Sequence, residues 1–130
     1  MSTPSSQPPG GPAPLSPEIR QHLSRMREYW LVLLTAGPER GQSEVEANAI
    51  QRGHLEHLFA LRGSGALAIA GPVLEADPRL RGICIFTCED RAEVEAHLRR
   101  DPAVRSGRLS YEILRWGGIA GDRLPEAQDG

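Results

Sequence analysis

In this 130-residue chain, His54 is a candidate for proton transfer at neutral pH, and Asp101 is a carboxylate that could orient it. An imidazole side chain can accept or donate a proton near neutral pH. A lone histidine beside apolar positions is more often a packed side chain, so that alternative stays open. Asp101 precedes Pro102, which favours a role as the N-cap of a short helical turn. A capping carboxylate still has a second oxygen for another partner.

Other residues support weaker hypotheses. His57 follows His54 by three residues, and two histidines at that spacing could share a metal ion, although no third ligand or zinc signature accompanies them. Gly71-Pro72 could be a turn that ends a strand, or could let a ligand approach the backbone. Three arginines could bind a substrate carboxylate through paired hydrogen bonds, or could be solvated surface charges. They are Arg52, Arg108 and Arg115.

Four strands and two helices must position these residues. Runs rich in strand-forming residues cover residues 29–35, 66–70, 82–88 and 109–116. A capping box at Ser43 predicts a helix that ends at residues 63–65, and Asp90 predicts the start of a second helix that ends at Asp101. The order β-α-β-β-α-β is that of the ferredoxin-like fold. We therefore expect an α+β domain with a four-stranded antiparallel sheet whose first and third strands are central.

The remaining segments set the limits of this domain. Six of the eleven prolines fall in the first seventeen residues, so residues 1–15 are expected to form a disordered tail rich in Pro, Ser and Gly. Ser16-Pro17-Glu18 predicts an extra helix over residues 16–27. The domain then covers residues 16–118, and residues 119–130 form a flexible end.

Composition argues against several classes of protein. The formal net charge of −2 gives no basic footprint for a nucleic acid or an anionic membrane surface. No apolar run is long enough to cross a membrane, and the N-terminus lacks the pattern of a signal peptide. All fifteen basic residues are arginine, which excludes lysine Schiff-base chemistry and a P-loop lysine.

The two cysteines indicate a reducing compartment. Cys84 and Cys88 fall on one predicted strand, about 13 Å apart, which is too far for a disulfide. We therefore expect reduced thiols and a cytoplasmic location.

The two central strands are apolar on both faces. Residues 30–34 and 83–86 carry apolar side chains at odd and even positions alike, whereas a sheet covered by helices on one face alternates apolar and polar residues. The face turned away from the helices must therefore also be buried. In a chain of this length only a second copy can cover it, so we expect a homodimer with its sheets packed face to face.

Six short segments follow one another across the predicted core. They are Arg52-Gly53-His54-Leu55-x-x-Leu58, Gly65-x-Leu67, Ala70-Gly71-Pro72, Gly82-x-x-Ile85-Phe86, Asp101-Pro102-Ala103-Val104 and Gly107-Arg108-Leu109. In this order and spacing they resemble the YciI-like (YCII-related) family of the dimeric α/β-barrel superfamily, over residues 29–117. The resemblance implies a barrel-like dimer with a cleft in each half, and it implies that His54 and Asp101 are the catalytic pair. It also implies cofactor-free proton transfer or elimination on small ring compounds, including loss of chloride from a chlorinated aromatic.

We therefore expect an enzyme without a cofactor that catalyses isomerisation, or elimination such as dehydrochlorination, on a small and anionic organic substrate. His54 is the expected general acid/base, Asp101 its orienting carboxylate, and Gly71 and Pro72 the substrate-binding residues. Two alternatives remain on the same dimeric fold: a non-catalytic small-molecule binding or regulatory module, and an oxidation that is cofactor-free or haem-dependent. The first hypothesis requires the His54 ring and the Asp101 carboxylate to lie within hydrogen-bond reach, directly or through one water.

Overall fold

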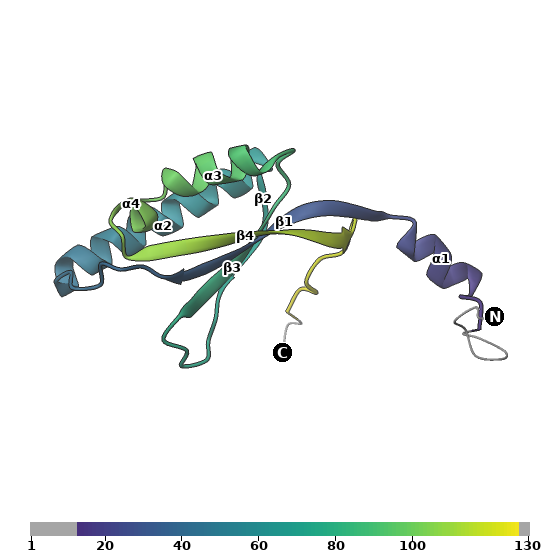
Figure 1. Cartoon of the computed structure of the whole chain (residues 1–130), viewed down its shortest axis with the longest axis horizontal. Coiled ribbons are helices and arrows are strands. Elements are labelled where there is room, and N and C mark those ends of the chain that lie inside the picture. Colours follow the sequence, from purple (N-terminus) through teal and green to yellow (C-terminus); the bar gives the residue numbers. More distant parts are fainter. Residues whose placement is uncertain (1–12, 128–130) are drawn as a thin grey trace, which may run out of the picture. The chain divides into compact units, whose positions relative to one another are not determined.

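The computed structural model describes residues 13–127, so predictions that concern residues 1–12 and 128–130 lie outside the described residues. The described chain forms two compact units, one of residues 28–117 and one made of residues 13–27 together with residues 118–127. The domain limits of 16–118 stay a prediction. In chain order (Figure 1) the elements are α1 (Pro17–Leu23), β1 (Met26–Ala36), α2 (Glu44–Ser64), β2 (Leu67–Pro72), β3 (Leu80–Phe86), α3 (Arg91–Arg99), α4 (Pro102–Arg105) and β4 (Leu109–Ile119).

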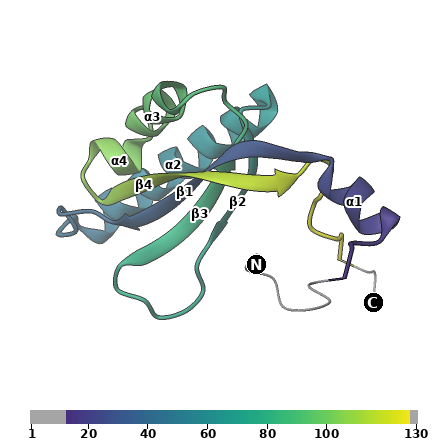
Figure 2. The same cartoon turned by 45° about the vertical axis from the view of Figure 1, so that its right-hand side comes forward.

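The strands form one four-stranded sheet in the order β2-β3-β1-β4. β3 pairs antiparallel with both β1 and β2. The predicted α+β fold of ferredoxin-like topology is therefore confirmed, with the first and third strands at the centre. Figure 2 shows α2, α3 and α4 together on one side of this sheet.

Alternate residues of the central strands build the core beneath those helices. The register pairs Val32 with Cys84 and Trp30 with Phe86. Val32, Cys84 and Phe86 are fully buried, and Val94 of α3 is buried in the same cluster. The helix-facing side of the sheet is thus a conventional hydrophobic core.

The intervening residues place apolar side chains on the other side of the sheet. Leu31 pairs with Ile85, and Leu33 with Ile83, and all four side chains are half-buried. Ile69 of β2 lies opposite Ile85 and extends this apolar surface toward the sheet edge. The central strands are therefore apolar on both faces, as the sequence indicates.

The helices begin where their capping residues predict. The Ser43 hydroxyl accepts a hydrogen bond from the Glu46 amide at 3.1 Å, and the Glu46 carboxylate accepts one from the Ser43 amide at 3.0 Å. Gly65 ends α2 in the left-handed conformation, with φ of 86°, and Asp90 caps α3 through the amide of Glu93. Among the described residues, none of the helices combines the length and the apolar character that a membrane crossing requires.

The extra helix predicted over residues 16–27 is shorter than expected. α1 ends at Leu23, and β1 begins at Met26 rather than at residue 29. The amide of Ala120 donates to the carbonyl of Arg25 at 3.0 Å, and the Arg25 guanidinium donates to the carbonyl of Ala120 at 2.7 Å. This pairing with a segment far along the chain favours an extended backbone from residue 25, and no local sequence signal announces it.

Three strand ends also differ from expectation. β3 stops at Phe86. The next residue, Thr87, still contacts the segment before β2: its amide donates to the carbonyl of Ala66 at 2.9 Å and its hydroxyl to the carbonyl of Gly65 at 2.7 Å. Cys88 therefore lies beyond the strand on which it was predicted. β2 runs through residues 71 and 72 instead of stopping there, since β2 is an edge strand and an edge strand tolerates proline. β4 continues past residue 116 to Ile119.

Candidate active site

His54 and Asp101 are hydrogen-bonded to each other inside the 28–117 unit. Nδ1 of His54 lies 2.6 Å from Oδ2 of Asp101. Only 8% of His54 and 1% of Asp101 is exposed, so the pair is shielded from bulk water. The predicted contact is therefore direct and needs no bridging water. The catalytic roles of the two residues stay a prediction.

Asp101 holds two partners at once. Its Oδ1 accepts a hydrogen bond from the Ala103 amide at 2.8 Å and so caps α4, while its Oδ2 faces His54. Pro102 at the first helical position fixes the backbone there. The sequence left open whether Asp101 is a cap or a partner of His54, and the two oxygens allow both.

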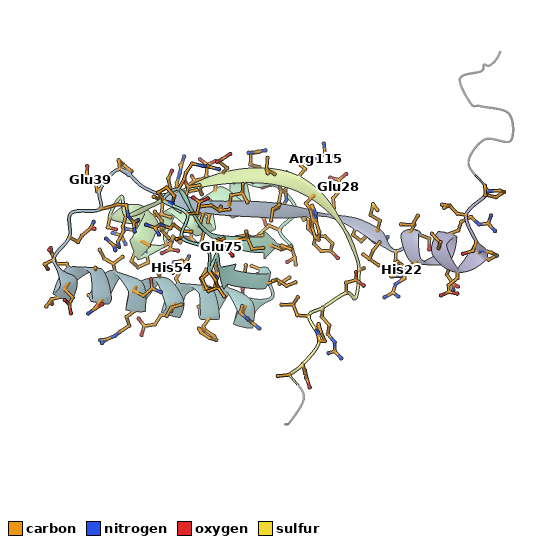
Figure 3. All side chains as sticks on the ribbon, turned by 90° about the horizontal axis from the view of Figure 1, so that it is seen from below. His22, Glu28, Glu39, His54, Glu75 and Arg115 are labelled. Atoms are coloured by element: carbon orange, nitrogen blue, oxygen red, sulfur yellow. The ribbon has the colours of Figure 1, made fainter. Side chains whose placement is uncertain are left out.

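The same contact defines the state of the imidazole. An ionised carboxylate only accepts hydrogen bonds, so Nδ1 of His54 carries the hydrogen that points at Asp101. In the neutral ring the lone pair then belongs to Nε2. Within residues 13–127 no other side chain or backbone group forms a hydrogen bond with that nitrogen. Figure 3 shows His54 on the side of α2 that faces the sheet.

Gly53 lets α2 approach α4 closely enough for this contact. A Cβ at position 53 would lie 2.9 Å from Cγ and 3.2 Å from Cβ of Pro102. Glycine inside a helix costs about 0.5–1 kcal/mol relative to alanine, so its place here has a packing reason. In the sequence Gly53 stands out only as part of a motif, because the close approach depends on α4, a helix remote along the chain.

A cavity of about 420 Å³ lies between α2 and the sheet, with His54 in its wall. That volume suits a small organic molecule. Gly71 and Pro72, the predicted substrate-binding residues, are in the same wall, whereas Asp101 stands behind the imidazole. Most of the remaining wall is apolar, with side chains such as Leu34, Ile50 and Leu58.

Cys84 also borders the cavity, but its thiol is a poor nucleophile. Burial, reinforced by the negative charge of Asp101, raises the pKa of Cys84 to about 12. The thiolate is the reactive form of cysteine. Cys84 therefore acts as a small apolar wall residue at neutral pH.

The other candidates from the sequence separate into two groups. Arg108 lines the cavity, but Arg52 is exposed on α2 away from the wall, and Arg115 of β4 pairs with Glu28 at 2.9 Å (Figure 3). The ring of His57 turns elsewhere: its Nε2 donates to the carbonyl of His97 at 2.7 Å, which does not favour a metal ion shared with His54.

Three further arginines in the wall were not singled out from the sequence. They are Arg40, Arg62 and Arg81. Arg40 follows a turn and Arg81 sits in a strand, so neither has a local signal that separates it from a solvated charge. Only the packing of remote segments brings Arg40 and Arg81 to the cavity, whereas Arg62 lies on the same helix as His54.

The family model of the YCII-related domain matches residues 20–117. Among solved structures, a 5-chloro-2-hydroxyhydroquinone dehydrochlorinase from Burkholderia phenoliruptrix AC1100, in complex with 2,5-dihydroxybenzoquinone, is similar at a TM-score of 0.49. Its sequence identity is 24%, and the alignment covers 66% of this chain and 92% of that one. No curated protein matches the sequence.

Proposed function

The chain belongs to the family of YCII-related domains, and we propose that it is an enzyme that transfers a proton at the His54–Asp101 pair without a cofactor. The observation that carries this proposal is the 2.6 Å contact between the two side chains, with the imidazole in the wall of a cavity large enough for a small organic substrate. An oriented imidazole with one free nitrogen is a general base, and its conjugate acid can return the proton.

The proposed step uses Nε2 of His54. Nε2 takes a proton from a carbon of the substrate, and the electron pair of the broken C–H bond forms a new carbon–carbon double bond. In an elimination, a leaving group such as chloride departs from the neighbouring carbon with its own electron pair. In an isomerisation, the new double bond displaces the electron pair of an adjacent double bond, and the imidazolium protonates that pair at another atom. Asp101 is a positioning residue that holds the ring and stabilises its positive charge through the bond to Nδ1.

Gly71 and Pro72 would contact the substrate at the edge of the sheet. Both border the cavity, and a Cβ built on Gly71 would meet no other atom within 4 Å. This open space supports the role assigned to the glycine, which is to let a ligand approach the backbone.

We further propose that the enzyme is a cytoplasmic homodimer. Cys84 and Cys88 are free thiols, which favours a reducing compartment. The half-buried Leu31, Leu33 and Ile85 leave an apolar surface on the sheet face opposite the helices, and a second copy of the same surface would cover it.

The test is proton exchange on a panel of small ring compounds that carry an acidic C–H beside a carbonyl or enol group, including chlorinated members. Loss of the C–H signal in D₂O is followed by NMR, and chloride release is followed in parallel. The His54→Gln variant should lose both activities, while His57→Gln, a matched change on the same helix, should keep them. Binding of a ring compound by the wild-type protein with neither exchange nor chloride release would identify a non-catalytic binding or regulatory module instead.

A further inference from the structure

The cavity beside His54 contains arginines without acidic partners. Four guanidinium-bearing residues are in its wall, and no aspartate or glutamate of the described chain joins them there. They are Arg40, Arg62, Arg81 and Arg108. Within residues 13–127 the ion pairs of arginine involve other residues, namely Arg79 with Glu112, Arg99 with Glu95 and Arg115 with Glu28. The positive charge at the cavity is therefore not neutralised by the protein.

Two of these arginines are held together by their loops. The carbonyl of Arg108 accepts a hydrogen bond from the Gly37 amide at 2.9 Å and another from the Arg40 guanidinium. A Cβ on Gly37 would lie 2.1 Å from the carbonyl oxygen of Gly107, so only glycine permits this approach of the two loops. The Arg108 guanidinium donates to the neutral amide oxygen of Gln42 at 2.9 Å, which orients it without cancelling its charge.

The third arginine reaches the same place from β3. Leu34 pairs with Gly82 but Thr35 pairs with Leu80, so Arg81 is the extra residue at an irregularity in the ladder. Such irregularities re-aim a side chain, and Arg81 borders the cavity. Burial, and then the charges of Arg108 and Arg81, lower the pKa of Arg40. A guanidinium still stays protonated at neutral pH, so the three like charges of Arg40, Arg81 and Arg108 repel one another at the cavity.

We propose that Arg40, Arg81 and Arg108 form a subsite for the carboxylate group of an organic substrate whose apolar body lies along the wall toward His54. The placement of the reacting carbon beside His54 rests on the proposed function, whereas the subsite itself rests on the cavity and its charges. A carboxylate matches the planar fork of a guanidinium, and the apolar wall favours an organic acid over a small inorganic anion. The bound carboxylate would relieve the repulsion among the three arginines and orient the substrate.

The test measures binding by titration calorimetry of the full-length protein, at ionic strength held constant with sodium chloride. The probes are benzoate, its uncharged counterpart benzyl alcohol, and inorganic phosphate. We expect benzoate to bind at least about tenfold more tightly than either of the other two. Equal affinity for benzoate and benzyl alcohol, or no benzoate binding up to the solubility limit, would overturn the proposal. Phosphate binding more tightly than benzoate would overturn the assignment to an organic carboxylate.

Variants locate the subsite. Arg81→Gln should weaken benzoate binding by about tenfold, and Arg81→Lys, which keeps the charge but loses the fork, should fall between. Arg115→Gln is the matched control, because Arg115 lies outside the cavity wall and pairs with Glu28. Wild-type affinity in Arg81→Gln, or an equal loss in Arg115→Gln, would refute the site. Arg40→Gln should also weaken benzoate binding by about tenfold. Its unfolding transition shows whether the loop keeps its stability without the hydrogen bond from Arg40 to the carbonyl of Arg108.

The result separates this proposal from the proposed function. His54→Gln should retain benzoate binding while losing proton exchange. If the wild-type protein binds benzoate through Arg81 but exchanges no proton, the carboxylate subsite stands and the enzyme proposal fails. If proton exchange depends on His54 while Arg81→Gln binds benzoate with wild-type affinity, the enzyme proposal stands and the subsite proposal fails.

Discussion

Gly53 and Pro102 touch where α2 meets α4, and each stands directly beside one member of the His54–Asp101 pair. A Cβ at position 53 would lie 2.9 Å from Cγ of Pro102, closer than a side chain can approach without movement. The 2.6 Å hydrogen bond between residues 54 and 101 therefore depends on a glycine that carries no chemistry of its own.

This relationship predicts the effect of Gly53→Ala. Alanine gains about 1 kcal/mol in helix propensity, but crowding against the proline ring costs about 1–3 kcal/mol. We expect the free energy of unfolding to fall slightly and activity to drop by about tenfold, because the two side chains are pushed apart. Gly63→Ala on the same helix is the control, since a Cβ there would meet nothing within 4 Å. Urea unfolding should show that Gly63→Ala is stabilising. An equally stabilising Gly53→Ala would contradict the tight contact.

Asp101→Asn separates the two functions of this carboxyl group. Asparagine caps helices about as well as aspartate, so the Ala103 contact should persist. An amide nitrogen facing Nδ1 would move the ring hydrogen of His54 to Nε2, and proton exchange should fall about 10²- to 10⁴-fold. NMR of the imidazole nitrogens reports the tautomer directly. Full activity with the hydrogen on Nε2 would show that Asp101 serves only as a cap.

The raised pKa of the Cys84 thiol predicts that the free energy of unfolding falls at alkaline pH. Its pKa in the folded protein is raised from 9.0 to about 12 by burial, reinforced by Asp101. The folded state keeps the thiol protonated, whereas the unfolded chain releases the proton above pH 9. The contribution of Cys84 to the free energy of unfolding is therefore complete below pH 9 and is lost as the pH rises toward 12. In Cys84→Ala the free energy of unfolding should therefore decline less steeply above pH 9 than in the wild type. This difference in slope does not depend on how stable the variant is at neutral pH. Identical slopes for variant and wild type would contradict the assignment.

The apolar face of the sheet predicts the oligomeric state. Light scattering should give about twice the chain mass of 14.2 kDa. Ile85→Glu places a charge in the proposed interface, at a cost of several kcal/mol, and should yield monomers. Leu74→Glu is the control, because Leu74 is 91% exposed in the loop between β2 and β3. A wild-type monomer, or an Ile85→Glu dimer of unchanged affinity, would remove the homodimer proposal.

Local signals predict much of this fold. Ser43, Asp90 and Asp101 satisfy backbone amides a few residues away, so their capping roles can be inferred from neighbouring residues. The order of strands and helices, together with the apolar alternation of the strands, leads to the ferredoxin-like topology. The pairing of His54 with Asp101 was expected from the family resemblance, because no local sequence signal near either residue indicates the other.

What the sequence missed depends on contacts between remote segments. The backbone is extended from residue 25 because Arg25 pairs with Ala120, a segment far along the chain. Arg40 and Arg81 reach the cavity through a loop contact and a strand irregularity. Local propensity carries no information on such pairs, so the arginine cluster is visible only in three dimensions.

The two oxygens of Asp101 couple the orientation of the His54 ring to the folding of α4. This helix has four residues, and so short a helix has little stability of its own. Whenever its first turn frays, the Ala103 amide is released and the carboxylate that orients His54 is free to rotate away. In the proposed mechanism, the fraction of molecules with a correctly oriented His54 ring then cannot exceed the fraction in which α4 is formed. Hydrogen exchange at one backbone amide, that of Ala103, would thus measure the fraction of molecules in which this capping hydrogen bond is formed.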